Sequence, residues 1–163
     1  MSSKNLSNYI GGEWRTSSGE HLLVRNPATA AELARVPLSS AAEVDTATRA
    51  AAEAAREWRE VPVTDRVQYL FKLKNLLEAN IEGLARILTS ECGKTLAESL
   101  GELRRGIENV EVACGAPSLL QGYNNEDIAR GMDEHMFRQP VGVAAAITPF
   151  NFQIGRASCR ERV

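Results

Sequence analysis

The sequence predicts an α/β fold, and two features that follow one another along the chain support this. Between residues 40 and 115, apolar residues recur at intervals of three and four, which places them on one face of an α-helix. After these helices comes the run 143–147, Val-Ala-Ala-Ala-Ile, which lies beyond the turn residues Pro140 and Gly142. A short apolar run of this kind is typical of a strand buried on both faces of a parallel sheet. Helices that lead into such a strand favour an α/β architecture.

The first forty residues predict short strands joined by tight turns. Gly11-Gly12 stands between apolar residues of the segment 8–14, a pattern typical of a β-hairpin. Two further strands are expected at 21–25 and 34–37, connected through the turn dipeptide Asn26-Pro27.

A first helix is expected to begin at Ser40, because Glu43 three residues later completes a capping-box pattern. Pro62 should end this helix, since proline cannot continue its hydrogen bonding. The many alanines of the apolar stripe suit close packing against a neighbouring element. The stripe consists of Val44, Ala47, Ala51, Ala54 and Trp58.

A second helical stretch should follow, with Thr64 as its cap, a break near Asn80 and a stop at Gly93. A third helix is expected from about Thr95 to Gly115. Its predicted apolar face consists of Leu96, Leu100, Leu103, Ile107, Val110 and Cys114. Beyond it the pattern becomes extended again, with a strand expected at 135–139.

Composition narrows the class of protein. The 163 residues are 44% hydrophobic and 25% charged with a net charge of −2, and their acids and bases are interleaved, so no nucleic-acid partner is expected. No apolar run approaches the roughly 20 residues of a membrane span. The polar segment 1–9 lacks the apolar core of a secretory signal, which favours a cytoplasmic protein. Three scattered cysteines and two isolated histidines predict neither a disulfide framework nor a metal site.

The final segment, 154–163, departs from the pattern before it. It is basic, rich in small residues and without apolar periodicity, and it matches the translation of a short-read sequencing adapter. We therefore expect residues 154–163 to be a non-native tail, with Gln153 encoded by a hybrid codon where a proline belonged. On this interpretation Cys159 has no catalytic role.

A series of short motifs resembles the aldehyde dehydrogenase superfamily. The segment 147–152, Ile-Thr-Pro-Phe-Asn-Phe, resembles the family's strand-end motif. Other matches occur in the family's order over residues 8 to 152. They are the segments 8–14 and 26–29, Trp58, Glu91-Cys92-Gly93-Lys94 for the usual E-x-G-K, and 140–143. The resemblance implies the N-terminal part of the aldehyde dehydrogenase fold, an incomplete Rossmann-like NAD domain without the usual G-x-G-x-x-G.

A narrower resemblance lies in 105–111, Arg-Gly-Ile-Glu-Asn-Val-Glu, and in 115–119, Gly-Ala-Pro-Ser-Leu. With Phe150 in place of tryptophan, these segments are similar to the CoA-acylating methylmalonate-semialdehyde dehydrogenases. That branch uses NAD and coenzyme A to convert methylmalonate or malonate semialdehyde into propionyl-CoA or acetyl-CoA with loss of CO₂.

The resemblance also implies roles for single residues. Asn151 would donate its side-chain amide N–H to the oxyanion that forms when a cysteine thiolate attacks the aldehyde. Ile147, Thr148, Pro149 and Phe150 would line the NAD site. Arg105 would bind the substrate carboxylate, for which a planar guanidinium is suited. Without the resemblance, Asn151 would be interpreted as a turn cap, Phe150 as core and Arg105 as a solvated side chain. Cys92 and Cys114 are interpreted as structural, and Lys94 as solvated.

The resemblance suggests a division of the chain, although the sequence itself shows no clean boundary. Residues 1–120 would be the N-terminal part of the NAD-binding domain, 121–140 an oligomerisation segment, and 141–153 the start of the NAD-binding sheet. The nucleophile would lie downstream, so this chain alone should be inactive, and its parent should be a homo-oligomer, a dimer or a tetramer. Two other interpretations remain open: a general NAD(P)-dependent aldehyde dehydrogenase and a non-catalytic helical interaction module.

Overall fold

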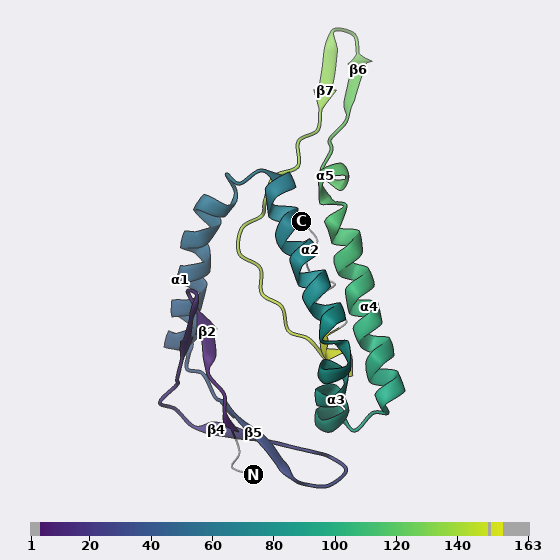
Figure 1. The fold of residues 1–163 in the computed structure, drawn as a ribbon. Helices are drawn as coiled ribbons and strands as arrows, with labels where there is room; N and C mark the ends of the chain where they lie inside the picture. The colour runs from purple at the N-terminus through teal and green to yellow at the C-terminus, as the bar shows by residue number, and fades with distance from the viewer. Residues whose placement is uncertain (1–3, 150, 155–163) are drawn as a thin grey trace.

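The computed structural model describes residues 4–149 and 151–154, and it has a mixed α/β architecture (Figure 1). Five short strands come first: β1 (Lys4–Asn5), β2 (Asn8–Ile10), β3 (Glu13–Arg15), β4 (His21–Arg25) and β5 (Glu32–Pro37). Five helices follow: α1 (Ala41–Trp58), α2 (Val63–Ala79), α3 (Ile81–Cys92), α4 (Leu96–Cys114) and the short α5 (Ala116–Leu119). The last two strands are β6 (Asn124–Ala129) and β7 (Met132–His135).

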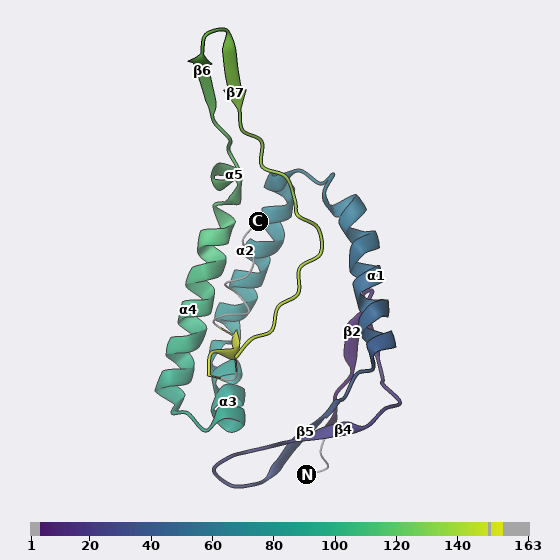
Figure 2. The ribbon, with the colours of Figure 1, turned by 180° about the vertical axis from the view of Figure 1, so that it is seen from behind.

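The strands form three small sheets. β2 and β3 make the predicted hairpin, in which Gly11 and Gly12 both have a positive φ, as a two-residue turn of this type requires. β5 pairs with β4 in antiparallel and with β1 in parallel orientation. β6 and β7 form a second hairpin that projects beyond the helices in both views (Figures 1 and 2).

The helix boundaries follow local hydrogen bonding. The predicted capping box of α1 is confirmed: the hydroxyl of Ser40 accepts from the backbone N–H of Glu43. α4 begins with a second capping box that was not predicted, in which the hydroxyl of Thr95 accepts from the backbone N–H of Glu98. Gly93 adopts the left-handed conformation (φ 71°) at the end of α3. A Cβ at this position would come within 2.9 Å of Cγ of Pro27, so the turn between β4 and β5 lies directly against the end of α3.

The packed core lies between α3 and α4. Ala85 and Leu88 of α3 and Leu103 of α4 are buried together, and partly buried apolar residues surround them. Farther along α4, Ile107 and Val110 are also buried, as the predicted stripe required. α4 also packs along α2, so its apolar stripe lies against two helices, α2 and α3 (Figure 1).

Three local predictions were wrong. The second helix begins at Val63 rather than after Thr64, because the carbonyl of Pro62 already accepts helical bonds from the N–H groups of Asp65 and Arg66. The strand expected at 135–139 lies earlier, in β7, which ends at His135. The turn at Gly131 (φ 74°) sets this register, because it pairs β7 with β6 from Met132 onwards. The stripe of α1 is not buried: no residue of α1 is buried, although the ring of Trp58 contacts that of Tyr69 on α2.

The prediction of a buried strand at 143–147 was also wrong for this chain. The segment 136–149 runs between α1 and α2 in both views without pairing to any described strand (Figures 1 and 2). Residues 143–147 are exposed throughout. A strand of a parallel sheet is buried only when strands pair with it on both sides and helices cover its faces, and no described strand pairs with this segment.

Candidate active site

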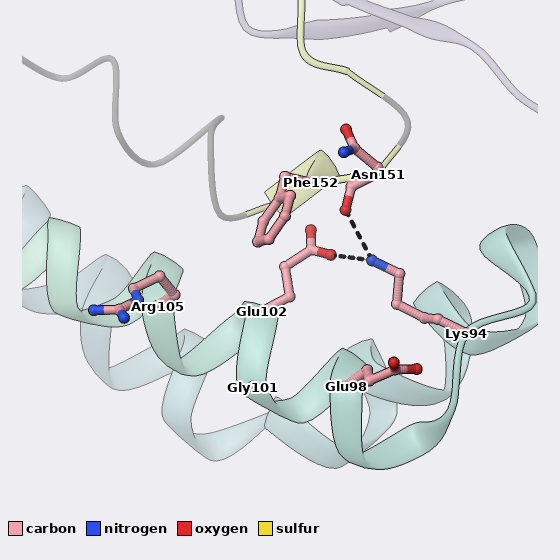
Figure 3. Close-up of a pocket in the computed structure, with 7 residues that line it drawn as sticks. All are labelled: Lys94, Glu98, Gly101, Glu102, Arg105, Asn151 and Phe152. Atoms are coloured by element: carbon pink, nitrogen blue, oxygen red, sulfur yellow. Dashed lines mark hydrogen bonds and ion pairs between the residues drawn. The ribbon is translucent and has the colours of Figure 1, made fainter.

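An open cavity of about 380 Å³ lies where the segment after residue 150 meets the first half of α4 (Figure 3). Its lining combines residues from the α3–α4 junction, from α4 and from the predicted strand-end motif. These are Lys94, Glu98, Gly101, Glu102, Arg105, Asn151 and Phe152. Two of the predicted site residues, Asn151 and Arg105, therefore line the same cavity.

Asn151 is held through its main chain. Its carbonyl oxygen accepts a hydrogen bond of 3.1 Å from Nζ of Lys94. Its side-chain amide is exposed and extends away from Lys94 (Figure 3). The amide therefore remains available to donate to a bound group, while the backbone that carries it is fixed.

Arg105 lies at the far end of the cavity from Lys94, and its guanidinium extends away from Asn151 (Figure 3). The side chain is 74% exposed and forms an ion pair of 3.0 Å with Glu108, one turn along α4. Arg105 is not among the residues of the predicted apolar face of this helix, and its exposure agrees with that prediction. An exposed pair of this kind is weak, so the guanidinium can exchange Glu108 for another carboxylate at small cost.

Of the residues expected to line the NAD site, three lie in the extended segment that leads to Asn151 and outside this cavity: Ile147, Thr148 and Pro149. The side chain of Ile147 is 85% exposed, and Thr148 and Pro149 are half-buried. Phe150 lies outside the described residues.

Glu102 was not predicted as a site residue, and the interpretation of Lys94 as solvated was wrong. The side chain of Glu102 is 2% exposed and that of Lys94 only 19%, and they form an ion pair of 2.5 Å between Oε2 and Nζ. The other carboxylate oxygen of Glu102 accepts a 2.8 Å hydrogen bond from the backbone N–H of Ile154. Lys94 is thus not solvated. The spacing along α4 could have indicated that Glu102 is buried. Glu102 lies three residues after the buried Ser99 and next to the buried Leu103, at the edge of the buried face.

Glu98 contributes a second carboxylate to the cavity. Hydrogen bonds from the backbone N–H and the hydroxyl of Thr95 hold its pKa below the ordinary value, and nearby Lys94 adds to this effect. Glu98 therefore stays ionised at neutral pH. The lining carries both signs of charge, with the two cations, Lys94 and Arg105, at opposite ends (Figure 3).

Cys92 and Cys114 are both half-buried, and burial is the main cause that raises the pKa of each thiol. A thiol with a raised pKa is mostly protonated at neutral pH and is a poor nucleophile. Among the described residues, no group of three or more histidine, cysteine or acidic side chains is arranged to hold a metal ion. Within the same part of the chain, no helix is long and apolar enough to cross a bilayer.

The model of the aldehyde dehydrogenase family matches residues 14–159, and the chain belongs to this family. Within it, the chain is similar to malonate-semialdehyde dehydrogenases. It is 51% identical over 150 residues to malonate-semialdehyde dehydrogenase 2 of Geobacillus thermodenitrificans, covering 91% of this chain and 31% of that protein. Malonate-semialdehyde dehydrogenase of Halalkalibacterium halodurans is 47% identical over 150 residues, with the same coverage.

Solved structures agree with the sequence comparison. Methylmalonate-semialdehyde dehydrogenase from Oceanimonas doudoroffii superposes with a TM-score of 0.89 at 38% identity, over 95% of this chain and 32% of that one. A Sinorhizobium meliloti structure, assigned as a methylmalonate-semialdehyde dehydrogenase and complexed with NAD, has a TM-score of 0.89 at 33% identity, over 96% and 32% of the two chains. The present chain thus spans about a third of the length of its relatives, and it corresponds to their N-terminal part.

Proposed function

We propose that this chain is part of an NAD-dependent, CoA-acylating dehydrogenase for malonate or methylmalonate semialdehyde. One observation carries the proposal: Asn151 and Arg105, which come from different elements, line one cavity. An amide donor and a guanidinium in one depression match the two ends of a carboxylated aldehyde. The identity to malonate-semialdehyde dehydrogenases over most of the chain supports the same substrate class.

In the proposed reaction, Asn151 binds the aldehyde oxygen. Its amide donates a hydrogen bond and carries no titrating charge, so it can stabilise the oxyanion that forms when the nucleophilic cysteine attacks. Arg105 binds the carboxylate at the other end of the substrate. The cysteine, which the relatives' remaining length would supply, is not one of the described residues.

The NAD site is proposed to be lined by Ile147, Thr148, Pro149 and Phe150. Residues 141–153 would form the start of a Rossmann-like sheet only in the full-length enzyme, where neighbouring strands can pair with them. NAD accepts the hydride in this chemistry, and coenzyme A takes up the acyl group. The proposed products are acetyl-CoA or propionyl-CoA and CO₂. The hairpin β6–β7, within 121–140, would join subunits of a homo-oligomer; its exposed strands have unpaired outer edges that can extend a neighbouring sheet.

The test uses the full-length dehydrogenase that contains this chain. The purified enzyme is given malonate or methylmalonate semialdehyde with NAD, with and without coenzyme A, and NADH and acyl-CoA are measured. CoA-dependent formation of acetyl-CoA or propionyl-CoA supports the proposal, and propanal serves as the substrate without a carboxylate.

Two outcomes would contradict it. Release of the free acid without any need for coenzyme A, together with equal use of propanal, would indicate a general NAD(P)-dependent aldehyde dehydrogenase. A protein without oxidation of any aldehyde would favour the interaction module. The fold alone does not separate the enzyme classes, since an Escherichia coli NADP-dependent enzyme also superposes with a TM-score of 0.88 at 32% identity.

A further inference from the structure

The ion pair between Lys94 and Glu102 connects three parts of the chain. Lys94 follows the left-handed Gly93 at the end of α3, and Glu102 lies on α4. Lys94 also donates to the carbonyl oxygen of Asn151, and Glu102 accepts from the N–H of Ile154 (Figure 3). Two charged side chains thereby bind both ends of the segment 151–154.

The burial of Glu102 makes its hydrogen-bond and ion-pair partners important for stability. A carboxylate that is almost fully buried is strongly destabilising unless its charge and both its oxygens have partners. One oxygen of Glu102 is paired with the ammonium of Lys94, and the other accepts the N–H at position 154. If the segment moved away, Glu102 would lose the N–H at position 154 as a partner and would be uncovered, because the segment lies over it. The buried, paired state of Glu102 therefore depends on the segment staying in place.

The two hydrogen bonds to the segment use its main chain only. Ile154 is the first residue of the expected non-native tail. The carbonyl of Asn151 and the N–H at position 154 would nevertheless be present with the natural side chains, unless position 154 is a proline. The ring of Phe152 adds a cation–π contact, with Nζ of Lys94 5.7 Å from its centroid. We call the ion pair of Lys94 and Glu102, with its hydrogen bonds to the segment 151–154, the clamp. The side-chain amide of Asn151 takes no part in the clamp, which leaves it available for substrate.

We propose that Lys94 and Glu102 are positioning residues that fix the backbone of 151–154 and so place the Asn151 amide for catalysis. The catalytic part of this inference rests on the proposed function of Asn151. An oxyanion donor acts only when it is already aimed at the position of the developing charge. A displacement of about 1 Å at such a site can lower a rate by about 100-fold.

A matched control exists on the same helices. Lys74 of α2 also pairs with two carboxylates, Glu78 and Glu111, at 3.3 Å each, and its side chain is 24% exposed. These partners lie on α2 and α4, and neither belongs to the segment 151–154. Lys74→Met therefore removes a lysine of similar burial and pairing without touching the clamp.

The first experiment measures amide hydrogen exchange in peptides that contain residues 151–154 of the full-length enzyme. Lys94→Met and Glu102→Gln should each accelerate exchange there, and Lys74→Met should not. Glutamine keeps the volume and an acceptor for the N–H at position 154, but its own N–H groups cannot accept from Lys94. Unchanged exchange in both clamp variants, or equal acceleration in Lys74→Met, would overturn the clamp.

The second experiment is a double-mutant cycle on kcat. Measured well below the Tm of each variant, Lys94→Met should lower kcat by roughly tenfold or more while the Kd for NAD stays close to that of Lys74→Met. Its Tm should fall further than that of Lys74→Met, because the substitution removes the cation paired with the buried Glu102 carboxylate. In an Asn151→Ala background the same substitution should cost less than about twofold, because its target is already gone. Independent, multiplying losses would overturn the positioning role and leave the proposed function intact. If Asn151→Ala alone leaves kcat unchanged, the proposed function of Asn151 is wrong, and with it the catalytic part of this inference.

Discussion

The substitution Arg105→Leu tests whether the cavity recognises a carboxylate. Leucine and arginine have similar helix propensities, so α4 should be preserved. The only ion pair lost among the described residues is the exposed one with Glu108, worth about 0.3–0.5 kcal/mol. The fold should therefore tolerate the change, and any larger effect belongs to the substrate.

The expected magnitude follows from the exposure of the site. A hydrogen bond to a charged group contributes about 1.5–3 kcal/mol, and an open cavity favours the lower end of this range. Loss of about 1.5 kcal/mol corresponds to roughly a tenfold increase in KM for malonate or methylmalonate semialdehyde. Because Arg105 would bind ground state and transition state alike, kcat should change little. Propanal has no carboxylate, and its KM should stay the same.

The assay follows NADH formation by the full-length enzyme over a range of each aldehyde. Arg104→Leu is the matched control: the neighbouring arginine is also exposed and forms a 3.6 Å ion pair with Glu78, but it does not line the cavity. A KM for the semialdehyde that does not change in Arg105→Leu refutes the carboxylate role. An equal increase for propanal refutes it as well.

Three further predictions concern the oxyanion donor, the start of α4 and the chain by itself. Asn151→Ala in the full-length enzyme should lower kcat roughly 100-fold and leave the Kd for NAD nearly unchanged, as titration of NAD by fluorescence can show; a weakened Kd with normal kcat would place Asn151 in the NAD site instead. Thr95→Ala should raise local opening of the first turn of α4 about fivefold, for a lost cap of about 1 kcal/mol, measured as amide exchange in peptides covering residues 96–100. The pKa of Glu98 is lowered in the folded state, so the stabilisation of α4 by ionised Glu98 is present above the ordinary pKa of a glutamate. This stabilisation is lost as the pH falls through the lowered pKa. The difference in exchange rate between wild type and Thr95→Ala should therefore shrink on acidification, and a difference that grows would contradict this. Residues 1–163 produced alone should aggregate and unfold without a sharp transition, because large apolar side chains such as Ile147 and Phe137 are exposed; a cooperative thermal transition by calorimetry would disprove this.

Local features of the fold could be predicted from sequence because their causes lie within a few residues. The turn at Gly11-Gly12, the capping box of α1 and the stop at Gly93 depend on hydrogen bonds between near neighbours. The stripe of Leu103, Ile107 and Val110 was found by its spacing. The strand at 143–147 could not be decided in this way, because an apolar run fixes neither its partners nor its burial.

For the candidate site too, local features could be predicted from sequence and contacts between distant segments could not. Sequence by itself determined the family, through motifs in a fixed order, and it singled out Asn151 and Arg105. It also placed Arg105 off the buried stripe of α4, since helical periodicity is a local property. Only the tertiary structure brought these two residues to one cavity, and only it revealed that Lys94 and Glu102 are buried together. The burial of a charge depends on what the rest of the chain packs over it, and the segment 151–154, far along the sequence from α4, supplies that cover.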